Sequence, residues 1–153
     1  MRITRSEEYG LRLVIRLASD GGQLTIRELS YSEKLPEPTV AKVIGRLRRS
    51  GVVRAERGRN GGYSLVGPAE AITIARVVEA FDEQMYDPAF CDRMSPGNNG
   101  CTHATGCGLR PVWHGLTSVI ADFLAGITVA DVIVGSPLPQ TPNRLPLVAG
   151  QQI

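Results

Sequence analysis

The strongest local signal in this 153-residue chain is a glycine-rich turn between two short β-prone runs. The runs cover Val52–Glu56 and Tyr63–Val66, and Asn60-Gly61 lies at the centre of the turn between them. Asn-Gly between two such runs is the strongest short-range sequence signal of a β-hairpin. We therefore expect a two-stranded antiparallel hairpin here.

Three helical patterns precede the hairpin. The first covers residues 4–19 and is capped by Thr4 or Ser6, and the second is a short helix capped by Thr25. The third runs from about Pro38 to Ser50, with Gly51 as its C-terminal stop. Three helices followed by a two-stranded hairpin is the order of elements in a winged helix-turn-helix.

Helical patterns return after the hairpin, at residues 72–81, 109–126 and 129–134. The apolar stripe of the 109–126 helix is broader than one small domain needs, which indicates a partner helix. The predicted fold class is mainly α with a small β-hairpin: a winged helix-turn-helix plus a long C-terminal dimerisation helix. The predicted parts are a DNA-binding domain (1–81), a cysteine loop (82–108), the dimerisation helix with a short following helix (109–134) and a disordered tail (135–153).

Net charge divides the chain into two unlike parts. Residues 1–66 hold 13 Lys+Arg and 7 Asp+Glu, a balance of +6, whereas residues 67–153 hold 4 and 8, a balance of −4. A basic part of this size predicts a polyanionic partner. A solvated basic face is the alternative that charge alone leaves open.

Several classes of protein do not fit the sequence. No apolar run approaches the ~20 residues that cross a bilayer, and Glu7 and Glu8 stand where a signal peptide has its basic region. The odd number of cysteines argues against a secreted disulfide scaffold. The glycine-rich turn is not a P-loop, and no Ser/His/Asp pattern is present. We therefore expect a cytosolic protein that is not an enzyme.

A basic surface suited to DNA follows from the predicted fold. The third helix of a winged helix-turn-helix enters the major groove, and an arginine on the wing can enter a minor groove. The residues predicted to contact DNA are Thr39, Lys42, Arg46, Arg48, Arg49, Arg57 and Arg59. Thr39 and Lys42 lie near the N-terminus of the third helix, where base edges are in reach. The three arginines that follow on this helix are suited to phosphates, and Arg57 and Arg59 lie on the wing.

All three cysteines, Cys91, Cys101 and Cys107, lie in a segment rich in Pro, Gly, Asn and acidic residues. A structureless loop of this length is unusual unless it is functional or held by something. Gaps of nine and five residues do not match the paired cysteines of structural zinc sites. Iron–sulfur clusters can be held by more widely spaced thiolates, and three thiolates leave one iron for a different ligand.

Other interpretations of the cysteines stay open at this point. A zinc site completed by His103 or His114 is one, and a redox thiol switch is another. The cysteines are also compatible with three unrelated reduced thiols.

Several stretches of the chain match one known family together. They are Met1–Thr4, Glu8–Arg12, Arg46–Val53, Arg57–Tyr63 and Cys107–Arg110, along with Trp113. With the three-cysteine loop, they resemble the IscR/NsrR/RirA-type family of bacterial iron–sulfur winged-helix transcriptional regulators. The resemblance extends to about Val134. It implies a homodimer joined by the long helix and cluster-dependent binding to a near-palindromic operator. The implied cofactor is an iron–sulfur cluster, with [4Fe-4S] favoured over [2Fe-2S].

The resemblance also bears on the fourth cluster ligand. The IscR branch has a histidine three residues after the last cysteine, but here that position is Arg110, which stays protonated and cannot ligate iron. The NsrR branch has a basic residue there and takes its fourth ligand from an acidic residue near the partner's N-terminus. The matching residue is Glu8, so the implied ligands are Cys91, Cys101, Cys107 and Glu8. His103 is a competing ligand, and the first cysteine gap is longer than is usual in the family.

The sequence thus predicts a DNA-binding regulator, expected to be a repressor, whose cluster senses nitric oxide, redox stress or the supply of iron and clusters. A winged-helix regulator with a zinc or thiol site is the first alternative. A small iron–sulfur electron-transfer protein is the second, but it leaves the basic helix and wing without a use.

Overall fold

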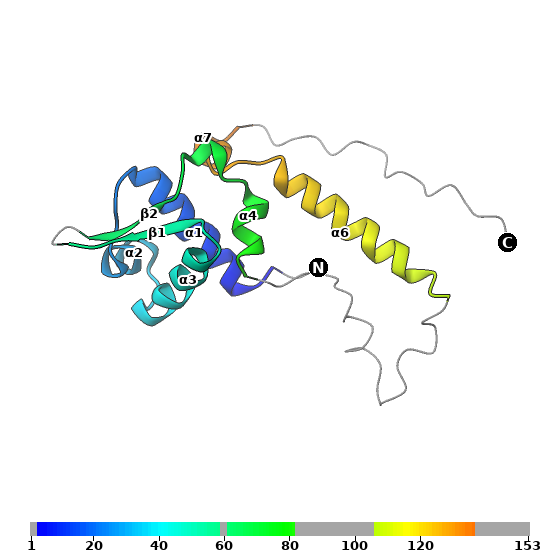
Figure 1. Ribbon diagram of the computed structural model, residues 1–153, viewed down its shortest axis with the longest axis horizontal. Helices are drawn as coiled ribbons and strands as arrows, with labels where there is room; N and C mark the ends of the chain where they lie inside the picture. The colour runs from blue at the N-terminus through cyan, green and yellow to red at the C-terminus, as the bar shows by residue number, and fades with distance from the viewer. Residues whose placement is uncertain (1–2, 59–60, 82–105, 137–153) are drawn as a thin grey trace, which may run out of the picture.

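The computed structural model describes residues 3–58, 61–81 and 106–136. Its mostly helical order, with a two-stranded antiparallel sheet after the third helix, is that of a winged helix (Figure 1). The predicted fold class is therefore confirmed. The elements are α1 (Arg5–Asp20), α2 (Ile26–Glu33), α3 (Glu37–Arg49), β1 (Val53–Glu56), β2 (Gly62–Leu65), the 3-10 turn η1 (Ala69–Ala71), α4 (Ile74–Glu79), α6 (Leu109–Ala125) and α7 (Val129–Val134).

Capping boxes begin three of these helices. At the start of α1 the cap is Thr4 rather than Ser6, and its backbone N–H donates to the Glu7 carboxylate at 2.7 Å. Thr25 and Glu28 form the same arrangement at α2, and the backbone and hydroxyl bonds from Thr25 hold the pKa of Glu28 below its ordinary value. Because each box satisfies donors that a helix N-terminus leaves free, these boundaries are encoded locally.

The core is built around α1, which contacts α2, α3, β2, α4 and α7. Its fully buried side chains are Leu13, Val14 and Leu17, with at most 2% of each exposed. Leu11, Ile15 and Ala18, which recur with Val14 at helical spacing, are half-buried. The reason is tertiary: α1 is covered on more than one side, so its buried face is wider than a single helical stripe.

The hairpin is tied to the helices by a third backbone segment. In the sheet, Val53 pairs with Leu65 and Glu56 with Gly62. Leu24, between α1 and α2, exchanges two backbone hydrogen bonds with Tyr63 of β2, at 3.0 and 2.8 Å. At Gly61 an added Cβ would lie 2.5 Å from the Glu56 carbonyl oxygen, so this turn requires a glycine. The wing is thereby held in a fixed direction from the helical body.

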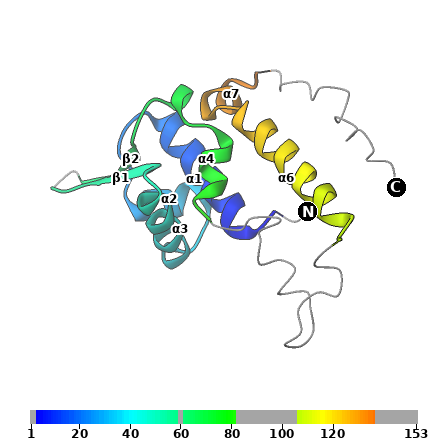
Figure 2. The ribbon, with the colours of Figure 1, turned by 45° about the vertical axis from the view of Figure 1, so that its right-hand side comes forward.

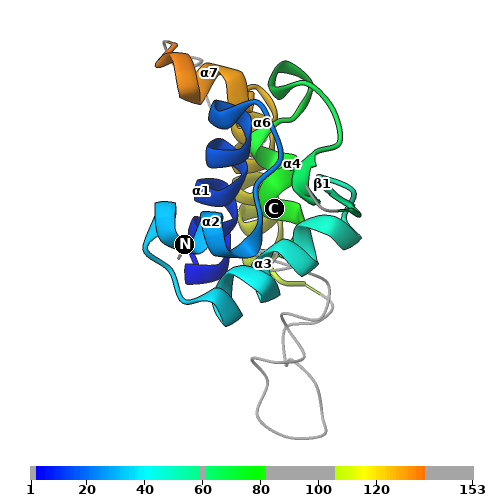
Figure 3. The same cartoon turned by 90° about the vertical axis from the view of Figure 1, so that its left-hand side faces the viewer.

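Helix α6 leaves the body of the molecule. Its C-terminal end is anchored where Thr73 and Thr128 form a backbone bridge, with Ile74 N–H donating to the Ile127 carbonyl at 2.9 Å. Its other end projects away from the bundle in Figures 1 and 2, while Figure 3 views the bundle with α6 behind α1 and α4. No residue of α6 is buried in the single chain.

Some predictions fall outside the described residues. Cys91, Cys101, His103 and the tail from residue 137 are among them. Within the described ranges, no helix has the length and apolar character needed to span a membrane.

Candidate functional site

Helix α3 presents basic side chains on its outer side. Its buried side consists of Val40, Val43, Ile44 and Leu47. Lys42 and Arg49 lie on the opposite side and are exposed, and Thr39 is half-buried. At 3.6 residues per turn, Lys42 and Arg49 stack two turns apart on one face, which is the face that a duplex groove would meet.

A second basic group lies where the hairpin joins α3. Arg48, Arg54 and Arg57 line one open hollow there, and all three are exposed. Arg54 Nε donates to Ser64 Oγ at 3.1 Å and lies 3.2 Å from a Glu56 carboxylate oxygen, so this side chain is oriented across the strands. We call Arg48, Arg54 and Arg57 the wing-base arginines. Arginines grouped in this way are suited to phosphate oxygens, which they can bind through two parallel N–H bonds.

Sequence reasoning missed Arg54 as a candidate, although strand alternation could have found it. It points outward from β1 in the register that pairs it with Ser64. Arg59, the other predicted wing contact, lies outside the described residues.

Arg46 does not join the exposed basic face. It is half-buried, and its guanidinium lies against Phe81 at the end of α4. The sequence predicted Thr39, Lys42, Arg46 and Arg49, three or four residues apart, as DNA contacts of one helix. The structure places residues 42 and 49 on the exposed face and turns residue 46 toward the body of the protein.

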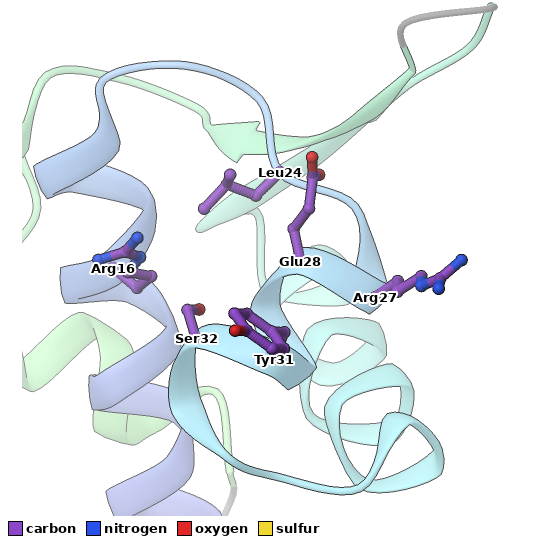
Figure 4. Close-up of a pocket in the computed structure, with 6 residues that line it drawn as sticks. All are labelled: Arg16, Leu24, Arg27, Glu28, Tyr31 and Ser32. Atoms are coloured by element: carbon purple, nitrogen blue, oxygen red, sulfur yellow. The ribbon is translucent and has the colours of Figure 1, made fainter.

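Helix α2 offers further candidates that the sequence did not single out. Tyr31 is 87% exposed and, with Arg16, Arg27 and Glu28, lines an open hollow between α1 and α2. Figure 4 shows the Arg27 side chain directed away from the hollow, into the surroundings. The first helix of a helix-turn-helix crosses the DNA backbone, so Arg27 and Tyr31 are positioned as candidate phosphate contacts.

The two adjacent glutamates at the start of α1 have different environments. Glu7 is buried, with 7% exposed, and its carboxylate is held by the Thr4 backbone N–H. Glu8 is exposed, and within the described ranges no hydrogen bond or ion pair reaches its carboxylate. Of the pair, Glu8 is the carboxylate available to a metal.

Cys107 precedes the first residues of α6. Its thiol is free, the residue is half-buried, and its carbonyl oxygen accepts from Arg110 N–H at 3.3 Å. A Cβ added at the neighbouring Gly106 or Gly108 would meet no atom within 4 Å, so there is open space on both sides of this cysteine. Thiolate is the ligand that iron–sulfur clusters use, and Cys107 is a free thiol just before α6.

One chain does not bring these ligand candidates together. The N-terminal ends of α1 and α6 lie well apart in Figures 1 and 2. Among the described residues, no group of three or more His, Cys, Asp and Glu side chains is arranged to hold a metal ion. His114 is exposed on α6, one helical turn beyond Arg110.

Residues 3–135 match the family model of Rrf2, which is described as an iron-dependent transcriptional regulator. The chain is 30% identical over 135 residues to the HTH-type transcriptional regulator IscR of Erwinia tasmaniensis, covering 87% of this chain and 79% of that protein. It is 28% identical over 146 residues to IscR of Yersinia pestis, covering 94% of this chain and 86% of that protein.

Solved structures agree on the fold. IscR of T. potens matches with a TM-score of 0.66 at 20% identity, over 90% of this chain and 89% of that one. The global cysteine regulator CymR of B. subtilis matches with a TM-score of 0.67 at 21% identity, over 90% of this chain and 99% of that one. The family match spans every described element, including the basic face of α3, the wing and α6. The chain therefore belongs to the Rrf2 family and is a DNA-binding transcriptional regulator, not an enzyme.

Proposed function

We propose that the protein is a homodimeric, iron–sulfur-dependent regulator, a repressor acting on a near-palindromic operator in the cytoplasm. The observation that carries this proposal is the combination, in one Rrf2-family chain, of an exposed basic α3 and wing with a free cysteine at the start of an unburied α6. DNA reading and cluster binding are then assigned to different parts of the same chain.

Dimerisation is proposed through α6. Four large apolar residues of its N-terminal half have 39–60% of their surface exposed, namely Leu109, Val112, Trp113 and Leu116. An apolar helix face of this kind is costly to leave in water and is typical of an interface between subunits. Pairing α6 with a second copy would cover it and would place two α3 helices on one molecule, as a palindromic operator requires.

The proposed cluster ligands are Cys91, Cys101 and Cys107 of one subunit and Glu8 of the other. Support comes from the open surroundings of Cys107, the free Glu8 carboxylate and the distance between their helix ends in one chain. A bound cluster supplies iron atoms that react with nitric oxide or oxidants and that are lost when iron is scarce. Ligands from both subunits would tie α1 of one subunit to the cysteine segment of the other, so that loss of the group changes how the subunits are held.

A redox thiol regulator is the second candidate. It is favoured by two structural neighbours, the global cysteine regulator CymR of B. subtilis and the oxidised form of Staphylococcus aureus CymR. It retains the DNA surface and assigns the cysteines to reversible oxidation. Iron and sulfide analysis separates the two candidates.

The DNA surface is tested by removing one wing-base arginine. We expect Arg57→Ala to weaken binding to a selected operator duplex by about tenfold, since one phosphate or base contact is worth roughly 1–3 kcal/mol. Its absorbance and iron content should equal those of the wild type. Fluorescence anisotropy at several salt concentrations measures the affinity, and Arg5→Ala, on the far end of α1, is the charge-matched control. If the wild type binds the operator and Arg57→Ala binds it with the same affinity, the placement of DNA at the wing is contradicted.

The fourth ligand is tested at Glu8. We expect Glu8→Ala to lose iron several times faster than the wild type in the presence of a chelator, because one iron then lacks its protein ligand. Glu8→Asp, which keeps the carboxylate, should fall between the two. Thermal unfolding of the cluster-free variant should match that of the cluster-free wild type, since the carboxylate is exposed. Equal rates of iron loss in all three proteins would remove Glu8 from the ligand set.

A further inference from the structure

Arg46 lies on the recognition helix α3 but does not face outward with its neighbours. At 3.6 residues per turn, successive residues are about 100° apart, which puts Arg46 at the edge of the buried face and some 60° from Arg49. Arg46 is half-buried, whereas Lys42 and Arg49 are exposed. The position of this arginine on the helix therefore allows it to reach a neighbouring element instead of a groove.

Two contacts join Arg46 to Phe81. Arg46 Nη1 donates to the Phe81 carbonyl oxygen at 3.3 Å, and the guanidinium carbon lies 5.8 Å from the centroid of the Phe81 ring. A guanidinium over an aromatic face is attracted by the ring as well as by the hydrogen-bond acceptor. Both contacts would be given up if the side chain swung out to a phosphate.

Phe81 is itself fixed on α1. Its side chain is 1% exposed, and a Cβ added at Gly10 would come within van der Waals overlap of two Phe81 ring carbons. The ring thus rests directly on the α1 backbone, within one helical turn of Glu8. Phe81 also stands immediately before residue 82, where the segment with Cys91 and Cys101 begins.

We propose that Arg46 is a positioning residue, which holds the recognition helix α3 on the Phe81–Gly10 contact of α4 and α1 and does not neutralise a DNA phosphate. The proposal rests on the DNA-binding function above, but its tests measure DNA affinity and thermal stability, neither of which requires the cluster to be the proposed one. Arg46 fixes the position of Lys42 and Arg49 relative to the rest of the subunit, and those two side chains contact the DNA.

Salt dependence distinguishes the two roles. Each phosphate neutralised by a side chain makes log affinity fall more steeply with log salt, by about 1 in the slope. One arginine lost from each of two subunits therefore makes the slope shallower by about 2. Binding of the full-length chain to a selected duplex of about 30 base pairs, which holds two half-sites, is measured for the wild type and for Arg46→Ala and Arg49→Ala. We expect both variants to bind roughly fivefold to tenfold more weakly. Only Arg49→Ala should show the shallower slope. A slope made shallower by about 2 in Arg46→Ala, as in Arg49→Ala, would overturn the proposal.

A double-variant comparison tests the contact itself. Phe81→Leu keeps an apolar side chain but removes the ring, and Phe81 lies away from the exposed face of α3. If Arg46 acts through Phe81, the loss of thermal stability in the double variant Arg46→Ala/Phe81→Leu is smaller than the sum of the two single losses. Additive losses would overturn the proposal. This comparison needs no DNA, so it stays decisive even if operator binding fails and the proposed function falls with it.

Discussion

Cys107→Ala is expected to yield a protein without visible absorbance and without stoichiometric iron or sulfide. The proposed site uses three thiolates and one carboxylate, so removing one thiolate leaves one iron without a protein ligand and only two thiolates to hold the cluster. Cys101→Ala should behave in the same way. The measurement is iron and sulfide analysis with an absorbance spectrum, on protein purified without oxygen.

The fold of this variant should be intact. Cys107 is half-buried at the start of α6 and belongs to no part of the hydrophobic core. Its circular dichroism should therefore match that of the cluster-free wild type. Arg57→Ala is the matched control, because it alters the DNA surface and should retain the full chromophore. Cys107→Ala protein with undiminished iron and colour would show that this thiol is not a ligand.

Phe81→Ala is expected to cost about 3–5 kcal/mol of the free energy of unfolding, the usual range for removing a buried phenylalanine ring. The ring is among the largest fully buried side chains, and it contacts the α1 backbone at Gly10 and the guanidinium of Arg46. Its removal leaves a cavity that the rigid backbone of α1 cannot fill. Urea unfolding at fixed protein concentration, followed by circular dichroism, measures the change.

An exposed apolar residue provides the comparison for Phe81. Val66 follows β2 with 48% of its surface exposed, so Val66→Ala should change the free energy of unfolding by less than about 0.5 kcal/mol. A loss below about 1 kcal/mol in Phe81→Ala would mean that Phe81 does not anchor α4 to α1.

Sequence patterns predicted the elements well where the signal is local. Thr25 with Glu28, and Thr128 with Asp131, mark helix starts through hydrogen bonds made within four residues. The Asn60-Gly61 turn, flanked by β-prone runs, predicted a hairpin whose strands are displaced by only one residue from expectation. These features need no information about the rest of the chain.

The features that sequence patterns did not reveal depend on contacts between distant elements. Leu13 and Leu17 are buried because α1 is covered by several helices, which a single-stripe pattern does not describe. Arg46 was predicted as a DNA contact along with Lys42 and Arg49, but its partner Phe81 is 35 residues away, just after the end of α4. Arg54 acquires its orientation from Ser64 on the paired strand.

The ligand prediction depends on a second copy of the chain. Glu8 and Cys107 were linked by resemblance alone, and a single chain leaves their helix ends apart. No pattern within one sequence can specify that two residues meet across a subunit interface. The exposed carboxylate of Glu8 and the open surroundings of Cys107 are what the structure adds to that prediction.

The most direct test of the account follows one preparation of the full-length chain, purified without oxygen, through loss of its cluster. Iron, sulfide, visible absorbance and affinity for a selected operator duplex are measured before and after treatment with nitric oxide. We expect a coloured protein with iron and sulfide, whose absorbance and operator affinity change together on treatment. A colourless, iron-free protein that binds the operator with full affinity would contradict it.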